Sequence, residues 1–115
     1  MSTTDREVVL SAVKVNGHAL KDVTVELKGD REVVLAAVKV DGQALEYASD
    51  NLKADREIVL AAVQEDGEAF QYAIHELKAN REFILKAFKE NNVICHVDEK
   101  FKGDPEVLLA NIKSN

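Results

Sequence analysis

The sequence predicts an all-α protein, a short α-solenoid of about four and a half helix-turn-helix repeats of 25 residues each. The first observation is repetition: DREVVLAAVKVDGQALEYASDNLKA at residues 30–54 is followed at 55–79 by DREIVLAAVQEDGEAFQYAIHELKA. The second is that apolar residues inside each copy recur at helical spacing. The third is that residue types typical of helix starts and helix ends fall at the same places in successive copies. Together they favour stacked helix pairs, because one such pair cannot bury its apolar face alone.

The repeats define the domain organisation. Each copy begins with an acidic residue or its amide, at Asp5, Asp30, Asp55, Asn80 and Asp104. Successive starts are 25, 25, 25 and 24 residues apart. We expect a single repeat domain over 1–115, with repeats at 5–29, 30–54, 55–79 and 80–103 and a half repeat at 104–115.

The first half of each repeat is predicted to be an α-helix capped by its opening residue. Asp and Asn accept hydrogen bonds from the free N–H groups of a first helical turn, and Glu two residues later suits the positive end of the helix dipole. The last copy supports this assignment, because Pro105 occupies the first helical position, where proline is tolerated. The residues of repeat two predicted to be buried are Val33, Val34, Ala37 and Val38, with Leu35 at the margin.

The second half of each repeat is predicted to be another helix, after a break at Gly17, Gly42 and Gly67, and at Asn92 in the fourth copy. Gly and Asn take the left-handed conformation with which helices often end. Residues 18–28 of repeat one are rich in β-branched side chains, so whether they form a regular helix is left open. The residues of the second helix of repeat two predicted to face inward are Ala44, Leu45, Ala48 and Leu52.

An alternative is that VVLAAVKV forms a strand, which would make the repeat a strand-helix horseshoe. A strand would place Lys86 on one face with Ile84 and Phe88. A helix places Lys86 on a polar stripe with Glu82 and Lys89, so the helical interpretation is favoured.

The pattern D-R-E-V-V-L-A-A-V-x-x-D/N-G-x-A-L-x-Y-A-S-x-x-L-K resembles the tandem repeat known as domain of unknown function 4116, which occurs in bacteria, often host-associated ones, and in some protists. The resemblance covers nearly the whole chain and is strongest over residues 30–79. It implies a helical repeat and a role in protein association, sometimes within secreted bacterial effectors. It implies no catalytic residues.

Composition and charge disfavour several classes of protein. With 46 % hydrophobic and 31 % charged residues, the chain has the composition of a folded domain. No apolar stretch approaches the roughly 18 residues of a membrane span, and the amino terminus lacks the features of a signal peptide. We expect a soluble protein, cytoplasmic by default, although secretion as an effector fits the resemblance. A net charge of −6 disfavours general attraction to nucleic acid or to an anionic membrane.

The chemically reactive residues predict no enzyme, no cofactor and no metal site. Cys95 aligns with apolar residues of the other copies, which predicts a buried and inert thiol. His96 diverges from Cys95 by about a quarter turn on a helix, which is poor geometry for shared metal binding. His18 and His75 have no evident partner ligands, and no phosphate loop, nucleophile elbow or paired-His zinc motif is present.

Tyr47 and Tyr72, one repeat apart, are candidate anchors for a partner, because Tyr is frequent at binding hot spots. Packing of each ring between helices, with the hydroxyl at the surface, is the simpler interpretation. The candidate interaction surface comprises Tyr47, Tyr72, Glu46, Asp50, Gln71 and His75.

Two charged rows are further candidates. An acidic row either docks a basic partner or maintains solubility. A basic row recurs at one edge of the repeats and is interleaved with the capping acids, which disfavours tracking of a polyanion. Its members are Lys28, Lys53, Lys78 and Lys102 with Arg6, Arg31, Arg56 and Arg81.

The sequence therefore predicts a non-enzymatic protein-protein interaction module, and the family resemblance makes a bacterial effector or inhibitor fragment one form that it could take. One alternative is nucleic-acid binding or acidic mimicry of nucleic acid. Another is a self-associating structural repeat, with Val23 and Val25 at the exposed end of repeat one. We expect a monomer or a weak homodimer with an unidentified protein partner.

Overall fold

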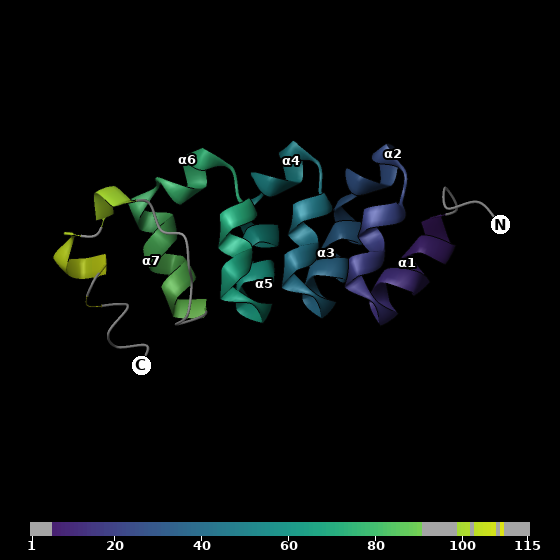
Figure 1. The fold of residues 1–115 in the computed structure, drawn as a ribbon, viewed down its shortest axis with the longest axis horizontal. Helices are drawn as coiled ribbons and strands as arrows, with labels where there is room; N and C mark the ends of the chain where they lie inside the picture. The colour runs from purple at the N-terminus through teal and green to yellow at the C-terminus, as the bar shows by residue number, and fades with distance from the viewer. Residues whose placement is uncertain (1–5, 91–98, 102, 108, 110–115) are drawn as a thin grey trace.

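The protein is an all-α solenoid in a computed structural model that describes residues 6–90, 99–101, 103–107 and 109. The described residues contain no strand, which confirms the predicted fold class. The repeats lie side by side along the longest axis of a body measuring 53 × 24 × 16 Å (Figure 1). The short helices α2, α4 and α6 lie along one edge of this row (Figure 1).

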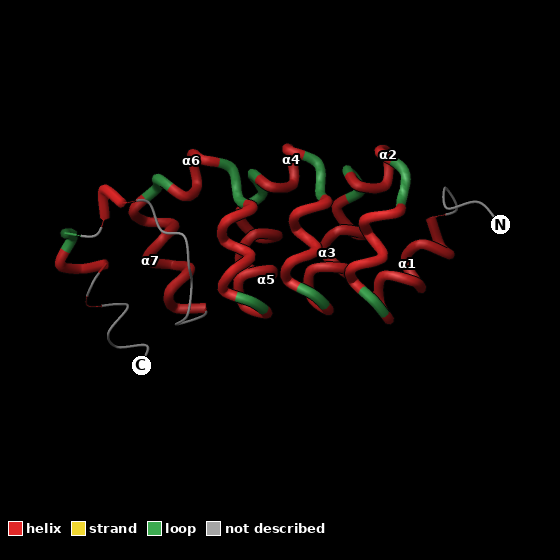
Figure 2. The backbone as a smooth tube through the Cα atoms, viewed as in Figure 1, coloured by secondary structure: helices red, strands yellow, loops and turns green. Residues whose placement is uncertain are grey.

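Repeats one to three each have three helical parts joined by short loops at the two edges of the molecule (Figure 2). The ten-residue α-helices are α1 (Arg6–Val15), α3 (Arg31–Val40), α5 (Arg56–Glu65) and α7 (Arg81–Glu90). The 3-10 helices are η1 (Gly17–Asp22), η2 (Gly42–Tyr47), η3 (Gly67–Tyr72) and the shorter η4 (Glu99–Phe101). The one-turn α-helices are α2 (Val25–Lys28), α4 (Asp50–Lys53) and α6 (His75–Lys78).

The predicted caps at Asp30, Asp55, Asn80 and Asp104 are confirmed. Asp30 Oδ1 accepts from the N–H groups of Glu32 at 3.0 Å and Val33 at 3.2 Å, and Asp55 does the same at the start of α5. Asn80 accepts from Phe83 N–H at 3.0 Å, and Asp104 from the N–H groups two and three residues later. The capping chemistry is therefore local to each repeat, as expected for an Asp or Asn N-cap. Asp5 lies outside the described residues.

The prediction of one continuous second helix is wrong. A six-residue 3-10 helix is followed by two extended residues, Ala48 with φ −73° and ψ 157° and Ser49 with φ −64° and ψ 160° in repeat two. The extension lets Ser49 N–H donate to the Lys28 carbonyl of the preceding repeat at 2.9 Å, and Ile74 N–H donates likewise to Lys53 at 3.2 Å. The backbone thus exchanges an intrahelical bond for a bond between repeats. Residues 18–28 of repeat one adopt the same conformation, as η1 and α2.

The reason predicted for the break glycines is also wrong, because neither Gly17 nor Gly42 has a positive φ. A Cβ atom on Gly42 would lie 2.3 Å from the carbonyl oxygen of Ala62, in the next repeat. Gly17 approaches the carbonyl of Ala37 equally closely. The glycines are therefore required because consecutive repeats touch backbone to backbone at this point. Asn92 lies outside the described residues.

The core runs the length of the described repeats as one cluster of aliphatic and aromatic side chains. The residues predicted to be buried in repeat two, Val33, Val34, Ala37, Val38, Ala44, Leu45, Ala48 and Leu52, are all buried. Leu35 is half-buried, as its place at the margin of the arc predicted. The stripe of Glu82, Lys86 and Lys89 is exposed, which excludes the strand alternative. Cys95 and His96 lie outside the described residues.

Candidate interaction surface

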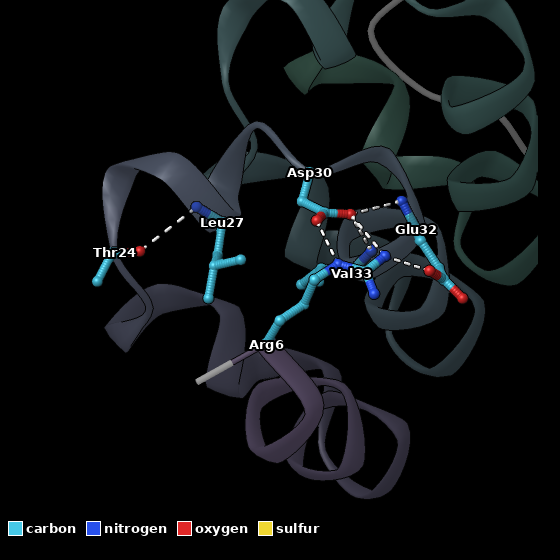
Figure 3. A network of polar contacts seen from close by, with 6 residues as sticks. All are labelled: Arg6, Thr24, Leu27, Asp30, Glu32 and Val33. Atoms are coloured by element: carbon cyan, nitrogen blue, oxygen red, sulfur yellow. Dashed lines mark hydrogen bonds and ion pairs between the residues drawn. The ribbon is translucent and has the colours of Figure 1, made fainter. Parts of the chain in front are cut away.

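Arginines of the predicted basic row bind the next repeat. The Arg6 guanidinium extends from α1 to the start of α3, where its Nε donates to Asp30 Oδ2 at 2.6 Å and its terminal amino group binds Glu32 (Figure 3). Asp30 therefore holds the first turn of its own helix and the preceding repeat at once. Because the contact is bidentate, it fixes the register of the two repeats as well as their distance.

The same contact recurs along the chain. Arg31 binds Asp55, with Nε to Oδ2 at 2.9 Å, and also binds Glu57. Arg81 binds Asp104, with Nε to Oδ2 at 2.6 Å, and also binds Glu106. We call the arginines at these positions, Arg6, Arg31, Arg56 and Arg81, the arginine ladder. Sequence reasoning missed these contacts, although the signal was present: each ladder arginine is followed 24 and 26, or 23 and 25, residues later by the cap position and a Glu.

Arg56 is the exception in the arginine ladder. Where Arg6 meets Asp30, Arg56 has Asn80, whose side-chain amide carries no charge. Arg56 makes no ion pair with a described residue. Its guanidinium carbon lies 5.8 Å from the ring centroid of Phe83, within the range of a cation–π contact. The carboxylate clamp is therefore replaced by a ring contact between repeats three and four.

The arginine ladder affects the acidity of its partners. The hydrogen bond from Arg6 holds the pKa of Asp30 below its ordinary value of 3.8, aided by the backbone N–H of Val33. Arg81 lowers the pKa of Asp104 in the same way. A carboxyl whose pKa is lower in the folded state favours folding above its unfolded pKa, and this contribution is lost as the pH falls through the folded pKa.

The Arg6→Gln variant is expected to lose less stability on acidification than the wild type. Asp30 then keeps its backbone bonds but not its strongest partner, so less stabilisation is lost as the pH falls below 3.8. The measurement is the melting temperature from about pH 6 to about pH 2. Lys21→Gln, which removes an equal charge from an exposed residue outside the ladder, should parallel the wild-type profile. Parallel profiles for Arg6→Gln and the wild type would contradict the assignment.

Tyr47 and Tyr72 are half-buried at the ends of η2 and η3, with their rings packed against the core. The hydroxyl of Tyr47 lies 3.2 Å from Nε2 of His18 in the preceding repeat, and the two rings meet edge to face at 5.1 Å. Partial burial, followed by the charge of Glu46, raises the pKa of both tyrosines.

The remaining members of the predicted surface occupy the same two repeats. Glu46 in η2 is exposed, and Asp50 and His75 are exposed at the first positions of α4 and α6. Gln71 is half-buried, with its side-chain amide donating to the Glu68 carbonyl at 3.2 Å. The six residues Tyr47, Tyr72, Glu46, Asp50, Gln71 and His75 are called the tyrosine surface below.

The candidates for self-association differ in exposure. Val25, at the start of α2, is 80 % exposed, whereas Val23 is half-buried against the core. Only Val25 therefore offers most of its side chain to a second molecule.

Metal-ligand clusters and membrane-spanning helices were sought among the described residues. These residues contain no group of three or more His, Cys, Asp or Glu side chains arranged to hold a metal ion. In the described part of the chain, no helix has both the length and the hydropathy needed to cross a membrane.

The fold and the contacts between repeats define a helical repeat protein. The family model "Domain of unknown function (DUF4116)" matches the chain twice in tandem, over residues 5–53 and 55–94. The chain belongs to this family, which confirms the resemblance predicted from its repeats. Comparison with curated proteins found no significant match, and neither did comparison with solved structures.

Proposed function

We propose that the protein is a non-enzymatic protein-binding module that docks a partner protein through the tyrosine surface. The observation that supports this proposal best is the placement of Tyr47 and Tyr72 at equivalent positions of successive repeats, each half-buried against the core with part of its ring at the surface. A half-exposed ring that is already held by packing loses little conformational freedom when it binds. Two such rings at a fixed separation are the kind of anchor found at binding hot spots.

The scaffold favours binding over catalysis. The loops between the described helices are only a few residues long, whereas catalytic residues are usually presented by longer loops on a rigid scaffold. A role as a bacterial effector or inhibitor fragment is the finer form of the proposal, and it follows from the family resemblance alone.

The alternatives have less support. Arg6, Arg31 and Arg81 are already bound by carboxylates, so a phosphate chain would have to displace those partners. Self-association through repeat one would draw on exposed side chains such as Val15 and Val25, whose area is far smaller than the contact area of a stable dimer.

Photo-crosslinking tests the proposed function. A benzophenone-bearing phenylalanine at position 72 is expected to form discrete covalent adducts with a protein in an extract of the native host. The adducts should be lost in the Tyr47→Ala background, because both rings are needed as anchors. The matched control carries the same photoreactive residue at Glu26, an exposed position of α2 outside the tyrosine surface. Identical adducts from both positions, or none from position 72, would contradict the proposal.

A further inference from the structure

We propose that a groove between α5 and α7 binds an acidic, amphipathic protein segment, with a carboxylate near Arg56 and Lys86 and an apolar side chain on Leu60 and Ala61. The groove is an open depression of about 460 Å³. We call it the α5–α7 groove; its lining residues are Arg56, Glu57, Leu60, Ala61, Gln64 and Lys86. It is built by helices that contribute nothing to the tyrosine surface, so the two proposals can fail separately.

The first argument is the interruption of the arginine ladder at this groove. The ladder arginines Arg6, Arg31 and Arg81 each bind two carboxylates of the following repeat. Arg56 has Asn80 in place of the first acid and makes no ion pair with a described residue. The guanidinium carbon of Arg56 lies 5.8 Å from the ring centroid of Phe83. None of the five guanidinium N–H donors bonds to a described residue, so they are available for a carboxylate.

The second argument is the position of Lys86. Its equivalents in repeats two and three are Ala36 and Ala61, so this repeat alone among the three adds a cation to the side of the groove. Lys86 is exposed and makes no ion pair with a described residue. The acid in the lining, Glu57, is bound by Arg31. Two cations that form no ion pair with a described residue therefore line one groove of a chain whose net charge is −6.

The third argument is the apolar floor. Leu60 and Ala61 are half-buried, so each presents part of an apolar surface to the solvent between the two cations. An aliphatic side chain laid on this floor would remove that surface from water, and a neighbouring carboxylate would reach the cations. Such a pair of groups belongs to an amphipathic protein segment. A nucleic acid would instead need cations at every repeat, and Arg31 and Arg81 are bound by carboxylates.

A second groove provides an internal control. The depression between α1 and α3 measures about 350 Å³ and is lined by Lys14, Glu32, Leu35, Ala36, Lys39 and Val40. Its floor has the same Leu-Ala pair as the α5–α7 groove. It lacks a ladder arginine, because Arg31 is bound by Asp55 and Glu57 of the next repeat. Because a guanidinium binds a carboxylate bidentately and an ammonium does not, we expect the α5–α7 groove to bind more tightly.

The experiment is a titration of the isotope-labelled protein with a synthetic helical peptide of Leu and Glu, followed by backbone amide shifts. We expect shifts at Leu60, Ala61 and Gln64 and at α7, with affinity that falls as salt is added. Three further probes are a Leu/Lys peptide, a Ser/Glu peptide and single-stranded oligothymidine. The Leu/Lys peptide should not bind. The Ser/Glu peptide should bind at least about tenfold more weakly than the Leu/Glu peptide, because it lacks an apolar side chain. Oligothymidine should not shift the same residues.

The double variant Arg56→Gln/Lys86→Gln should bind the Leu/Glu peptide at least about tenfold more weakly than the wild type. The control Lys14→Gln/Lys39→Gln removes the same charge from the groove between α1 and α3 and should bind the peptide as the wild type does. Ala61→Glu, at a position that already holds Lys86 in the next repeat, should abolish binding by repulsion. Melting curves will show that each variant is folded. Equal loss in the two double variants, shifts centred on α1 and α3, or comparable effects of oligothymidine would overturn the inference, as would the absence of any shift.

Discussion

Replacing Gly42 with Ala is expected to destabilise the protein by about 3 kcal/mol, the upper part of the usual range for overpacking a tight contact. The added Cβ would lie 2.3 Å from the carbonyl oxygen of Ala62 and 3.0 Å from Cβ of Asp66. The Ala62 carbonyl is part of the α5 backbone and accepts the N–H of Asp66, so it cannot rotate away as a side chain would. Repeats two and three would have to separate, which would also open the core between them. Urea denaturation followed by circular dichroism measures the change.

Gly29→Ala is the matched control for this substitution. The nearest atoms to its Cβ would be the Glu26 carbonyl oxygen and Ser49 Oγ, both at 3.6 Å, an ordinary van der Waals contact. Gly29 has φ −100° and ψ 3°, and Ala54 and Ala79 occupy its position in the next repeats. The variant should therefore be as stable as the wild type or gain up to about 1 kcal/mol through the unfolded state. Equal destabilisation by the two substitutions would show that close approach is not the reason for Gly42.

Phe70→Ala is expected to destabilise the protein by about 4 kcal/mol, as for a large aromatic side chain removed from a core. The side chain of Phe70 has no exposed surface. Its ring lies nearly parallel to that of Phe83 at 6.2 Å between centroids, so the substitution also removes an aromatic contact between repeats three and four. At this junction the arginine ladder supplies no carboxylate clamp, since Arg56 faces Phe83 instead. The same denaturation experiment measures the loss.

Phe70→Leu separates the cavity from the loss of the aromatic pair. Leu20 and Leu45 occupy the same buried position in repeats one and two, so the backbone there accepts leucine without strain. We expect a loss below about 1.5 kcal/mol, the usual limit for swaps between apolar side chains of similar volume. A loss as large as that of Phe70→Ala would mean that the ring contact, rather than the filled volume, stabilises this junction.

Local features of the chain could be predicted from the sequence because they depend on neighbours within a few residues. The N-caps at Asp30 and Asp55 serve N–H groups two and three residues away, and the buried stripe of α3 follows from helical spacing. Because the same residue types recur at equivalent positions of successive repeats, each repeat supports the same assignment. The half-buried state of Tyr47 and Tyr72 was likewise the simpler prediction from their place at the edge of an apolar arc.

Features that depend on contacts with a neighbouring repeat were decided by the tertiary structure. After Gly42 and Gly67 the chain forms a 3-10 helix with an extended exit, from which Ser49 and Ile74 donate to the Lys28 and Lys53 carbonyls of the preceding repeat. Gly42 is required by a carbonyl 20 residues away, not by its own dihedral angles. Arginines of the cation row bind the next repeat, and only the stacking of the repeats showed that Arg56 lines the α5–α7 groove without a carboxylate partner among the described residues. Helical periodicity describes one element at a time, whereas these contacts exist only after two repeats have packed against each other.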